Sequence, residues 1–147
     1  MIKPLIIFIE GQDRSGKTSL IRPIFQKTGM IHNIIDRGPL SNLVYSTMYG
    51  RDVDLNAYVD LLNNDRIVTF YLDTSISAIV KRTEESQDFN VPIKDISKHK
   101  ESWLNEVSKI KNFKNVFIID NSDITIEKTI DLIVEKINDY IKEQNYG

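Results

Sequence analysis

Short apolar runs alternate with longer segments of helical periodicity along this 147-residue chain. The runs are rich in β-branched residues and do not alternate with polar ones, which is typical of parallel strands covered on both faces. Four such runs occur, at residues 5–10, 32–36, 66–73 and 115–120. We therefore predict four strands joined by helical crossovers, and so an α/β domain with a parallel sheet.

The segments between these runs predict the helices. They span residues 17–27, 39–63, 75–85, 95–110 and 123–143. The second segment is expected to contain one or two helices with a break near Gly50, and the third begins beside a Thr-Ser pair suited to capping a helix. In the last segment, isoleucines recur at helical spacing and predict a buried stripe.

The chain has a simple organisation beyond these elements. No internal repeat, low-complexity segment or linker interrupts it, so residues 1–147 are predicted to form one domain. The polar stretch around Pro92 has weak periodicity, and residues 84–95 are predicted to form a short lid. In folds of this class, ligands bind at the carboxyl ends of the strands. Those ends carry four acids, which are Glu10, Asp36, Asp73 and Asp120.

Composition narrows the class of protein further. Basic and acidic residues give a formal charge of 19 − 21 = −2, so no basic field favours a polymeric nucleic acid as partner. The chain has no cysteine, which excludes disulfides, thiol catalysis and cysteine-bound metals. Its N-terminal apolar run is shorter than the core of a secretion signal, and no stretch reaches the roughly 20 apolar residues of a membrane span. We expect a cytoplasmic protein without a membrane partner.

The sequence GQDRSGKT at residues 11–18 matches the phosphate-binding loop G-x-x-x-x-G-K-[ST], between a predicted strand and a predicted helix. Its glycines let backbone N–H groups turn toward phosphate oxygens, and the helix adds the partial charge of its N-terminus. Lys17 is suited to neutralising the β- and γ-phosphates, and Thr18 to placing a hydroxyl on Mg²⁺. The predicted triphosphate-binding residues are Gly11, Gln12, Asp13, Arg14, Ser15, Gly16, Lys17, Thr18 and Ser19.

Other motifs separate the classes of protein that contain this loop. Downstream of it, the sequence has neither the D-x-x-G switch nor the N-K-x-D base reader of GTPases. The L-S-G-G-Q signature of transporter ATPases is also absent, and the chain is too small for a hexameric motor domain. Small kinases remain, which favours ATP as the phosphoryl donor.

These residues resemble those of the thymidylate kinases. FIEGQDRSGKTS, at residues 8–19, is similar to that family's loop (F/L)-E-G-x-D-x-x-G-K-[ST], and Arg14 stands where its eukaryotic-type branch carries arginine. IIDRG, at residues 34–38, is similar to the family's D-R-(Y/H) and to the E-R-S of deoxynucleoside kinases, and residues 70–85 are similar to its later strand and helix. The resemblance implies a P-loop kinase sheet of order 2-1-3-4, ATP and Mg²⁺ as cofactors, a deoxynucleotide or nucleoside as acceptor, and a homodimer.

The resemblance also implies catalytic roles for four charged residues. Arg14 would reach the transferring γ-phosphate and, with Lys17, stabilise its charge. Arg37 would hold the acceptor phosphate or the oxygen that becomes phosphorylated. Asp36 would organise Mg²⁺ together with Thr18, or act as the base if the acceptor is a hydroxyl.

Further residues complete the predicted acceptor and nucleotide sites. Asp13 would accept a hydrogen bond from the acceptor's 3′-hydroxyl, and two tyrosines four residues apart could stack on its base. The predicted acceptor-binding set is Asp13, Asp36, Arg37, Tyr45, Tyr49 and Arg51. Arg82 and Asn121 are predicted to lie beside the adenine.

Structural roles compete with several of these predictions. The neighbouring Asp36 and Arg37 could form an ion pair that closes the end of a strand, and the tyrosine pair could belong to the core. The two histidines, His32 and His99, are expected to be structural, and Trp103 is expected to be buried. The sequence KHK at residues 98–100 is expected to be a charged helix face.

Two features depart from the thymidylate kinase pattern. Only about seven residues, 28–34, separate the loop helix from IIDRG, where the family has an F-R-E-P-G segment that shapes its monophosphate pocket. Position 38 is glycine rather than tyrosine or histidine. Two alternatives therefore stay open: a kinase acting on a polynucleotide end or a modified base in DNA, and a nucleotide-binding regulatory domain without phosphoryl transfer.

Overall fold

A computed structural model of the chain describes residues 3–87 and 89–146. Four parallel strands form one sheet in the order β2-β1-β3-β4. The strands are β1 (Ile6–Glu10), β2 (Asn33–Asp36), β3 (Ile67–Leu72) and β4 (Val116–Ile119). Each lies within one of the predicted apolar runs and is one or two residues shorter. The predicted fold class and strand order are confirmed.

The helices also follow the predicted segments. They are η1 (Thr18–Leu20), α1 (Ile21–Lys27), α2 (Pro39–Met48), α3 (Leu55–Leu62), α4 (Ile76–Ser86), η2 (Ile93–Asp95), α5 (Ile96–Val107) and α6 (Ile126–Tyr146). The predicted break between α2 and α3 occurs at Gly50, whose φ of 67° suits glycine. Ser75 caps α4 by accepting a hydrogen bond from the N–H of Ala78 at 3.2 Å. The helix after the phosphate-binding loop begins as a 3₁₀ turn rather than as α-helix.

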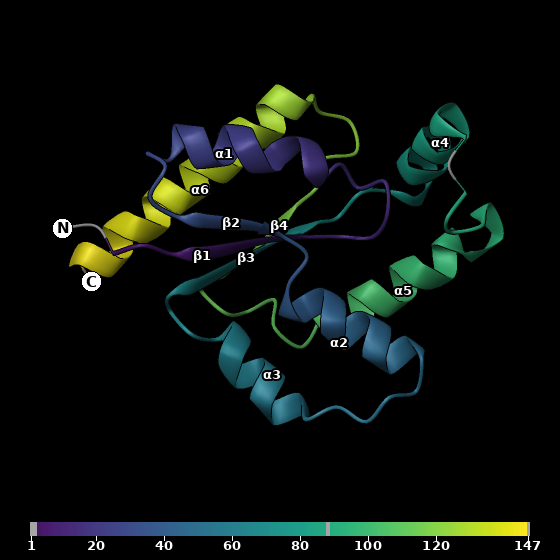
Figure 1. The fold of residues 1–147 in the computed structure, drawn as a ribbon, viewed down its shortest axis with the longest axis horizontal. Helices are drawn as coiled ribbons and strands as arrows, with labels where there is room; N and C mark the ends of the chain where they lie inside the picture. Colours follow the sequence, from purple (N-terminus) through teal and green to yellow (C-terminus); the bar gives the residue numbers. More distant parts are fainter. Residues whose placement is uncertain (1–2, 88, 147) are drawn as a thin grey trace.

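Helices cover the two faces of the sheet in separate groups (Figure 1). α1 and α6 pack on one face, where Ile7, Ile9, Ile133 and Ile137 form the centre of the larger core cluster. α2, α3 and α5 lie on the other face, and Trp103 stacks on Tyr71 there with ring centroids 5.8 Å apart. The buried position of Trp103 is therefore confirmed.

The expectation that all strands are covered on both faces is wrong for β2. Every residue of β3 is buried, because β3 lies between β1 and β4 under helices on both faces. β2 pairs only with β1, and most of its residues are exposed. Ile35 has 39% of its surface exposed. A continuous apolar run therefore corresponds here to an exposed edge strand, because the position of a strand in the sheet decides how far helices cover it.

The segment predicted as a lid contains the end of α4 and the connection to α5, including the 3₁₀ turn η2 directly before α5. Gln87 ends α4 in the left-handed conformation, with φ 56°. Residues 89–92 follow without regular structure, and residue 88 lies outside the described residues. Over residues 3–87 and 89–146, no helix combines the length and apolarity needed to cross a membrane.

Candidate functional site

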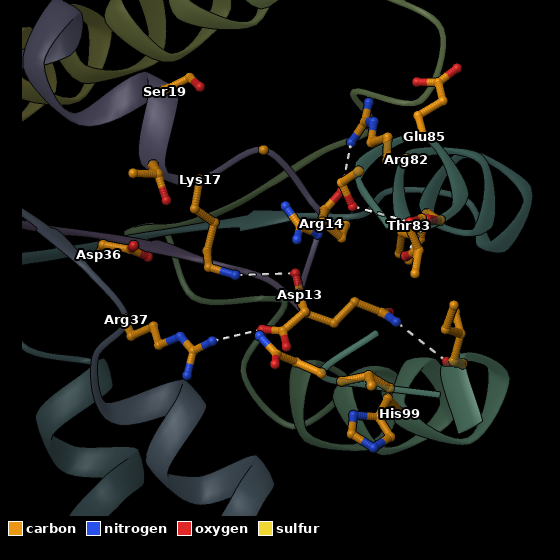
Figure 2. A pocket seen from close by; sticks show the side chains of 18 residues that line it. Asp13, Arg14, Lys17, Ser19, Asp36, Arg37, Arg82, Thr83, Glu85 and His99 are labelled. Atoms are coloured by element: carbon orange, nitrogen blue, oxygen red, sulfur yellow. Dashed lines mark hydrogen bonds and ion pairs between the residues drawn. The ribbon is translucent and has the colours of Figure 1, made fainter. Parts of the chain in front are cut away.

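A cavity of about 670 Å³ opens beside the carboxyl ends of β1 and β2. The loop after β1, the turn after β2, and helices α4 and α5 all contribute to its wall. Figure 2 shows Asp36 and Arg37 on one side of it, Arg82 and Glu85 on the other, and Lys17 and Arg14 between them. The predicted phosphate loop and the predicted acceptor motif therefore share one cavity.

The loop closes around its own lysine. The ammonium of Lys17 donates to the carbonyl oxygens of Gly11 at 2.5 Å and Gln12 at 3.1 Å. Gly11 is required at its position, since its φ is 154° and a Cβ there would lie 2.6 Å from the Ser15 Oγ. Burial lowers the pKa of Lys17, and the positive charge of Arg37 lowers it further.

Polar side chains outside the phosphate-binding loop hold its backbone in place through hydrogen bonds. The Asn121 amide donates to the Ser15 carbonyl at 2.7 Å, and its own oxygen accepts from the Thr74 hydroxyl at 2.5 Å. Arg82 donates to the Arg14 carbonyl at 3.0 Å. Asn121 was predicted to contact adenine, but its side chain lies beneath the loop, where it satisfies two buried partners. Arg82 does line the cavity, as do most residues predicted from the loop. The cavity-lining members of that set are Gln12, Asp13, Arg14, Gly16, Lys17, Thr18 and Ser19.

A second charged cluster lies in the turn after β2. Arg37 donates to the Asp13 carboxylate at 2.7 Å, so its ion-pair partner comes from the phosphate loop and not from the neighbouring Asp36. Asp36 lines the cavity, and its charge raises the pKa of Lys17 against the larger effect of burial. Arg37 has φ 67°, a left-handed conformation that is uncommon for a residue with a side chain.

The glycine after Arg37 has a steric explanation. A Cβ on Gly38 would lie 2.2 to 2.7 Å from atoms of the Phe8 ring. Phe8 therefore fills the space where a side chain at this position would begin. This accounts for glycine at the position where thymidylate kinases carry tyrosine or histidine.

The predicted base-stacking residues lie next to the cavity but are not part of its wall. The Arg37 guanidinium lies 6.0 Å from the Tyr45 ring centre, and Tyr45 stacks on Tyr49 at 6.5 Å. Arg51 in turn lies 5.4 Å from the Tyr49 ring centre. Tyr45 also meets the edge of Trp103, whereas Tyr49 is 65% exposed. These residues form a row that leads from Arg37 along α2 to the surface.

Two residues of α5 have roles that the sequence did not predict. His99 lines the cavity, and Lys100 is buried with its ammonium on the Asp73 carboxylate and on the Thr74 carbonyl, the latter at 2.8 Å. The expectation of a charged surface face at residues 98–100 is therefore wrong for Lys100. A signal was present, because Lys100 falls in the helical stripe of buried residues that includes Ile96 and Trp103. His32 is structural as expected, since its Nδ1 accepts from the Leu5 N–H at 2.9 Å.

The wall of the cavity also carries oxygen-containing side chains suited to binding a magnesium ion. Thr18 and Asp36 both line it. Mg²⁺ typically takes one or two protein ligands and completes its shell with water and substrate phosphates. A hydroxyl and a carboxylate fit that requirement. No group of three or more histidine, cysteine, aspartate or glutamate side chains that could hold a metal occurs among the described residues.

Comparison with known proteins identifies the fold. The sequence matches no protein-family model and no curated protein. Among solved structures, the YorR protein of Bacillus subtilis in complex with phosphorylated GDP matches with a TM-score of 0.74 and 18% identity, over 90% of this chain and 95% of that one. Thymidylate kinase from Candida albicans matches with 0.68 and 17%, over 95% and 94%. The chain has the P-loop kinase fold.

A third structure extends the same P-loop kinase fold to a nucleoside kinase. Deoxyadenosine kinase from M. mycoides with bound dCTP matches with a TM-score of 0.64 and 15% identity, over 92% of this chain and 100% of that one. Identities this low establish the fold alone.

Proposed function

We propose that this protein is an ATP-dependent phosphotransferase that moves the γ-phosphoryl group to a deoxynucleotide or nucleoside. One observation carries the proposal: the phosphate-binding loop and a second charged cluster, Asp36 and Arg37 at the turn after β2, line the same cavity. A protein that only binds a nucleotide has no need for the second cluster. The proposed donor and acceptor sites are therefore adjacent.

The donor half follows from the loop. The Lys17 ammonium is buried and donates to neutral carbonyl oxygens of the loop, and burial outweighs the nearby acids, so that its pKa is lowered. A triphosphate would supply the missing negative charge, and its oxygens would replace the loop carbonyls as acceptors. Arg14 lines the same cavity and would add a second cation at the γ-phosphate. Arg82 would support the loop and border the nucleotide.

The acceptor half follows from the ion pair between Asp13 and Arg37. An acceptor would separate the pair, so that Arg37 contacts its phosphate or reacting oxygen and Asp13 accepts from a hydroxyl of its sugar. The acceptor oxygen then forms a bond to the γ-phosphorus while the bond to the β-bridging oxygen breaks and ADP leaves. If the acceptor is a hydroxyl, its proton passes to Asp36, which lines the cavity.

Mg²⁺ and the lid complete the proposal. Thr18 would hold the ion, together with Asp36 where Asp36 does not act as the base, and the bound ion neutralises charge on the phosphates. Glu85, Asn90 and Val91 of the proposed lid line the cavity, so closure of residues 84–95 would exclude water from it. The proteins of like fold include a thymidylate kinase and a deoxyadenosine kinase, which is consistent with either a nucleotide or a nucleoside as acceptor.

A polynucleotide end is the second candidate acceptor. The row of Arg37, Tyr45, Tyr49 and Arg51 favours it, because aromatic and guanidinium groups in series can follow a single strand. The formal charge of −2 favours the smaller acceptor instead.

The test is transfer of label from γ-labelled ATP to a panel of nucleosides, nucleoside monophosphates and oligonucleotides with free ends. We expect labelled product with at least one nucleoside or monophosphate. Label on the oligonucleotides alone would replace that acceptor with a polynucleotide. If ATP binds but no acceptor and no water receives label, the protein is a nucleotide-binding domain and the proposed reaction is wrong.

A further inference from the structure

Glu10 is a buried acid that the proposed reaction does not use. It ends β1, directly before the phosphate loop, and its side chain has no exposed surface. Burial raises the pKa of Glu10, and hydrogen bonds oppose that rise. A buried carboxylate is costly unless its oxygens are satisfied, so the partners of Glu10 indicate what it does.

Three hydrogen bonds to Glu10 come from the start of α2. Its Oε1 accepts from the Gly38 N–H at 3.0 Å and from the Ser41 hydroxyl at 2.5 Å, and its Oε2 accepts from the Ser41 N–H at 3.1 Å. Gly38 is the N-cap of α2. These N–H groups therefore belong to the first turn, where a helix has no internal acceptors and favours negative charge. Glu10 caps α2 from the neighbouring strand.

This cap fixes the backbone on either side of Arg37. The Arg37 N–H donates to the Ile9 carbonyl at 3.1 Å, and the next N–H, of Gly38, donates to Glu10. Consecutive residues of β1 thus hold consecutive residues of the turn. Arg37 is kept in its left-handed conformation between these two bonds, and its guanidinium reaches Asp13, three residues beyond Glu10.

We infer that Glu10 is a positioning residue, which places Arg37 against the acceptor by anchoring the turn between β2 and α2 to the strand of the phosphate loop. This inference rests on the proposed function. The hydrogen bonds of Glu10 go to Gly38 and Ser41, neither of which lines the cavity, so it acts on Arg37 through the backbone of the turn, while its charge also raises the pKa of Lys17. Loss of the anchor lets the guanidinium of Arg37 shift, and a shift of about 1 Å in a positioning group lowers turnover by up to about 100-fold.

The substitution Glu10→Gln tests this with little change in size. The amide replaces one oxygen with an NH₂ group, which cannot accept from a backbone N–H. Glu106→Gln is the matched control, because Glu106 is also buried but lies on α5, paired with Lys109 at 2.8 Å. Should Glu10→Gln fail to fold, Glu10→Asp takes its place in every measurement, since it keeps the charge but withdraws the carboxylate by one methylene.

The central experiment is a double-mutant cycle between Glu10→Gln and Arg37→Ala, read as kcat/KM for the acceptor. We expect Glu10→Gln to lower kcat/KM about 10- to 100-fold, with an ATP dissociation constant within about twofold of the original. When Arg37→Ala is already present, adding Glu10→Gln should lower kcat/KM by a further factor of less than about three, because Glu10 acts through Arg37. Glu106→Gln should change neither quantity. Equal losses in both backgrounds, or a loss of ATP affinity equal to the loss of activity, would overturn the inference.

Amide hydrogen exchange separates failure of this inference from failure of the proposed function. In Glu10→Gln we expect the Gly38 and Ser41 amides to exchange at least about tenfold faster, while amides of residues 11–17 keep their rates. If the original protein transfers no phosphoryl group, the proposed function fails and exchange alone decides whether Glu10 anchors the turn. Unchanged exchange at Gly38 and Ser41 overturns the anchor, whatever the activity.

Discussion

The buried ion pair between Lys100 and Asp73 joins the helix that carries His99 to the carboxyl end of β3. The two partners differ in burial: the Lys100 side chain is 11% exposed and that of Asp73 is 35% exposed. Lys100 also donates to the Thr74 carbonyl at 2.8 Å, and its ammonium lies 5.7 Å from the Tyr71 ring centre. We predict that removal of the acid destabilises the fold more than removal of the base.

The expected magnitudes follow from what each substitution leaves behind. Asp73→Ala leaves an ammonium that water barely reaches, with one carbonyl as partner, and should cost about 3 kcal/mol, at the low end for a broken buried pair. Lys100→Met keeps the packing against Tyr71 and leaves a carboxylate that is one-third exposed and can be hydrated again. Its cost should be about 1 kcal/mol, near that of one hydrogen bond. The double variant should cost about as much as Lys100→Met, because no unpaired charge remains.

Urea unfolding measures these costs through Trp103, the single tryptophan, which is buried on the same helix. The free energies of unfolding are compared among variants whose m-values are equal, because an unchanged m-value is expected when unfolding stays two-state. The reasoning is refuted if Lys100→Met costs as much as Asp73→Ala, because exposure would then not decide the cost of an unpaired charge.

Two further predictions concern the strand and turn beside the cavity. Gly38→Ala should destabilise the protein by about 1–3 kcal/mol in urea unfolding, because the new Cβ would overlap the Phe8 ring. In a Phe8→Ala background the same substitution should cost less. Equal costs in the two backgrounds would contradict the steric explanation. Because burial raises the pKa of Glu10 above 4.5, the folded state binds its proton more tightly than the unfolded state does. The stability of the original protein relative to Glu10→Gln should therefore fall as pH rises from 4.5 through the raised pKa, and a rise over that interval would contradict the assignment.

The elements of this fold follow from local sequence. Non-alternating apolar runs located all four strands, and the phosphate-loop motif located the turn between β1 and η1. Glycine at position 50 marked the break between α2 and α3, since a left-handed residue ends a helix there. These signals depend on neighbours within a few residues, and the sequence contains them directly.

The contacts that shape the site depend on which crossovers bring distant residues together. Arg37 pairs with Asp13, 24 residues away, and not with the adjacent Asp36. The Asn121 amide donates to the carbonyl of Ser15, 106 residues away, and so supports the phosphate-binding loop. His99 lines the cavity only because α5 packs beside the carboxyl end of β3. No local pattern contains this information, so the partners of these residues could not be predicted from the sequence.

Replacement of Arg14 by alanine gives the most direct test of phosphoryl transfer in this cavity. Arg14 lines the cavity with Lys17, and the proposal assigns it to the γ-phosphoryl group in transfer. We predict that Arg14→Ala lowers the rate of transfer from γ-labelled ATP by about 10³-fold or more, with ATP affinity nearly unchanged. Arg22→Ala, at an exposed position of α1, should leave both quantities unchanged. An unchanged transfer rate in Arg14→Ala would contradict the assignment.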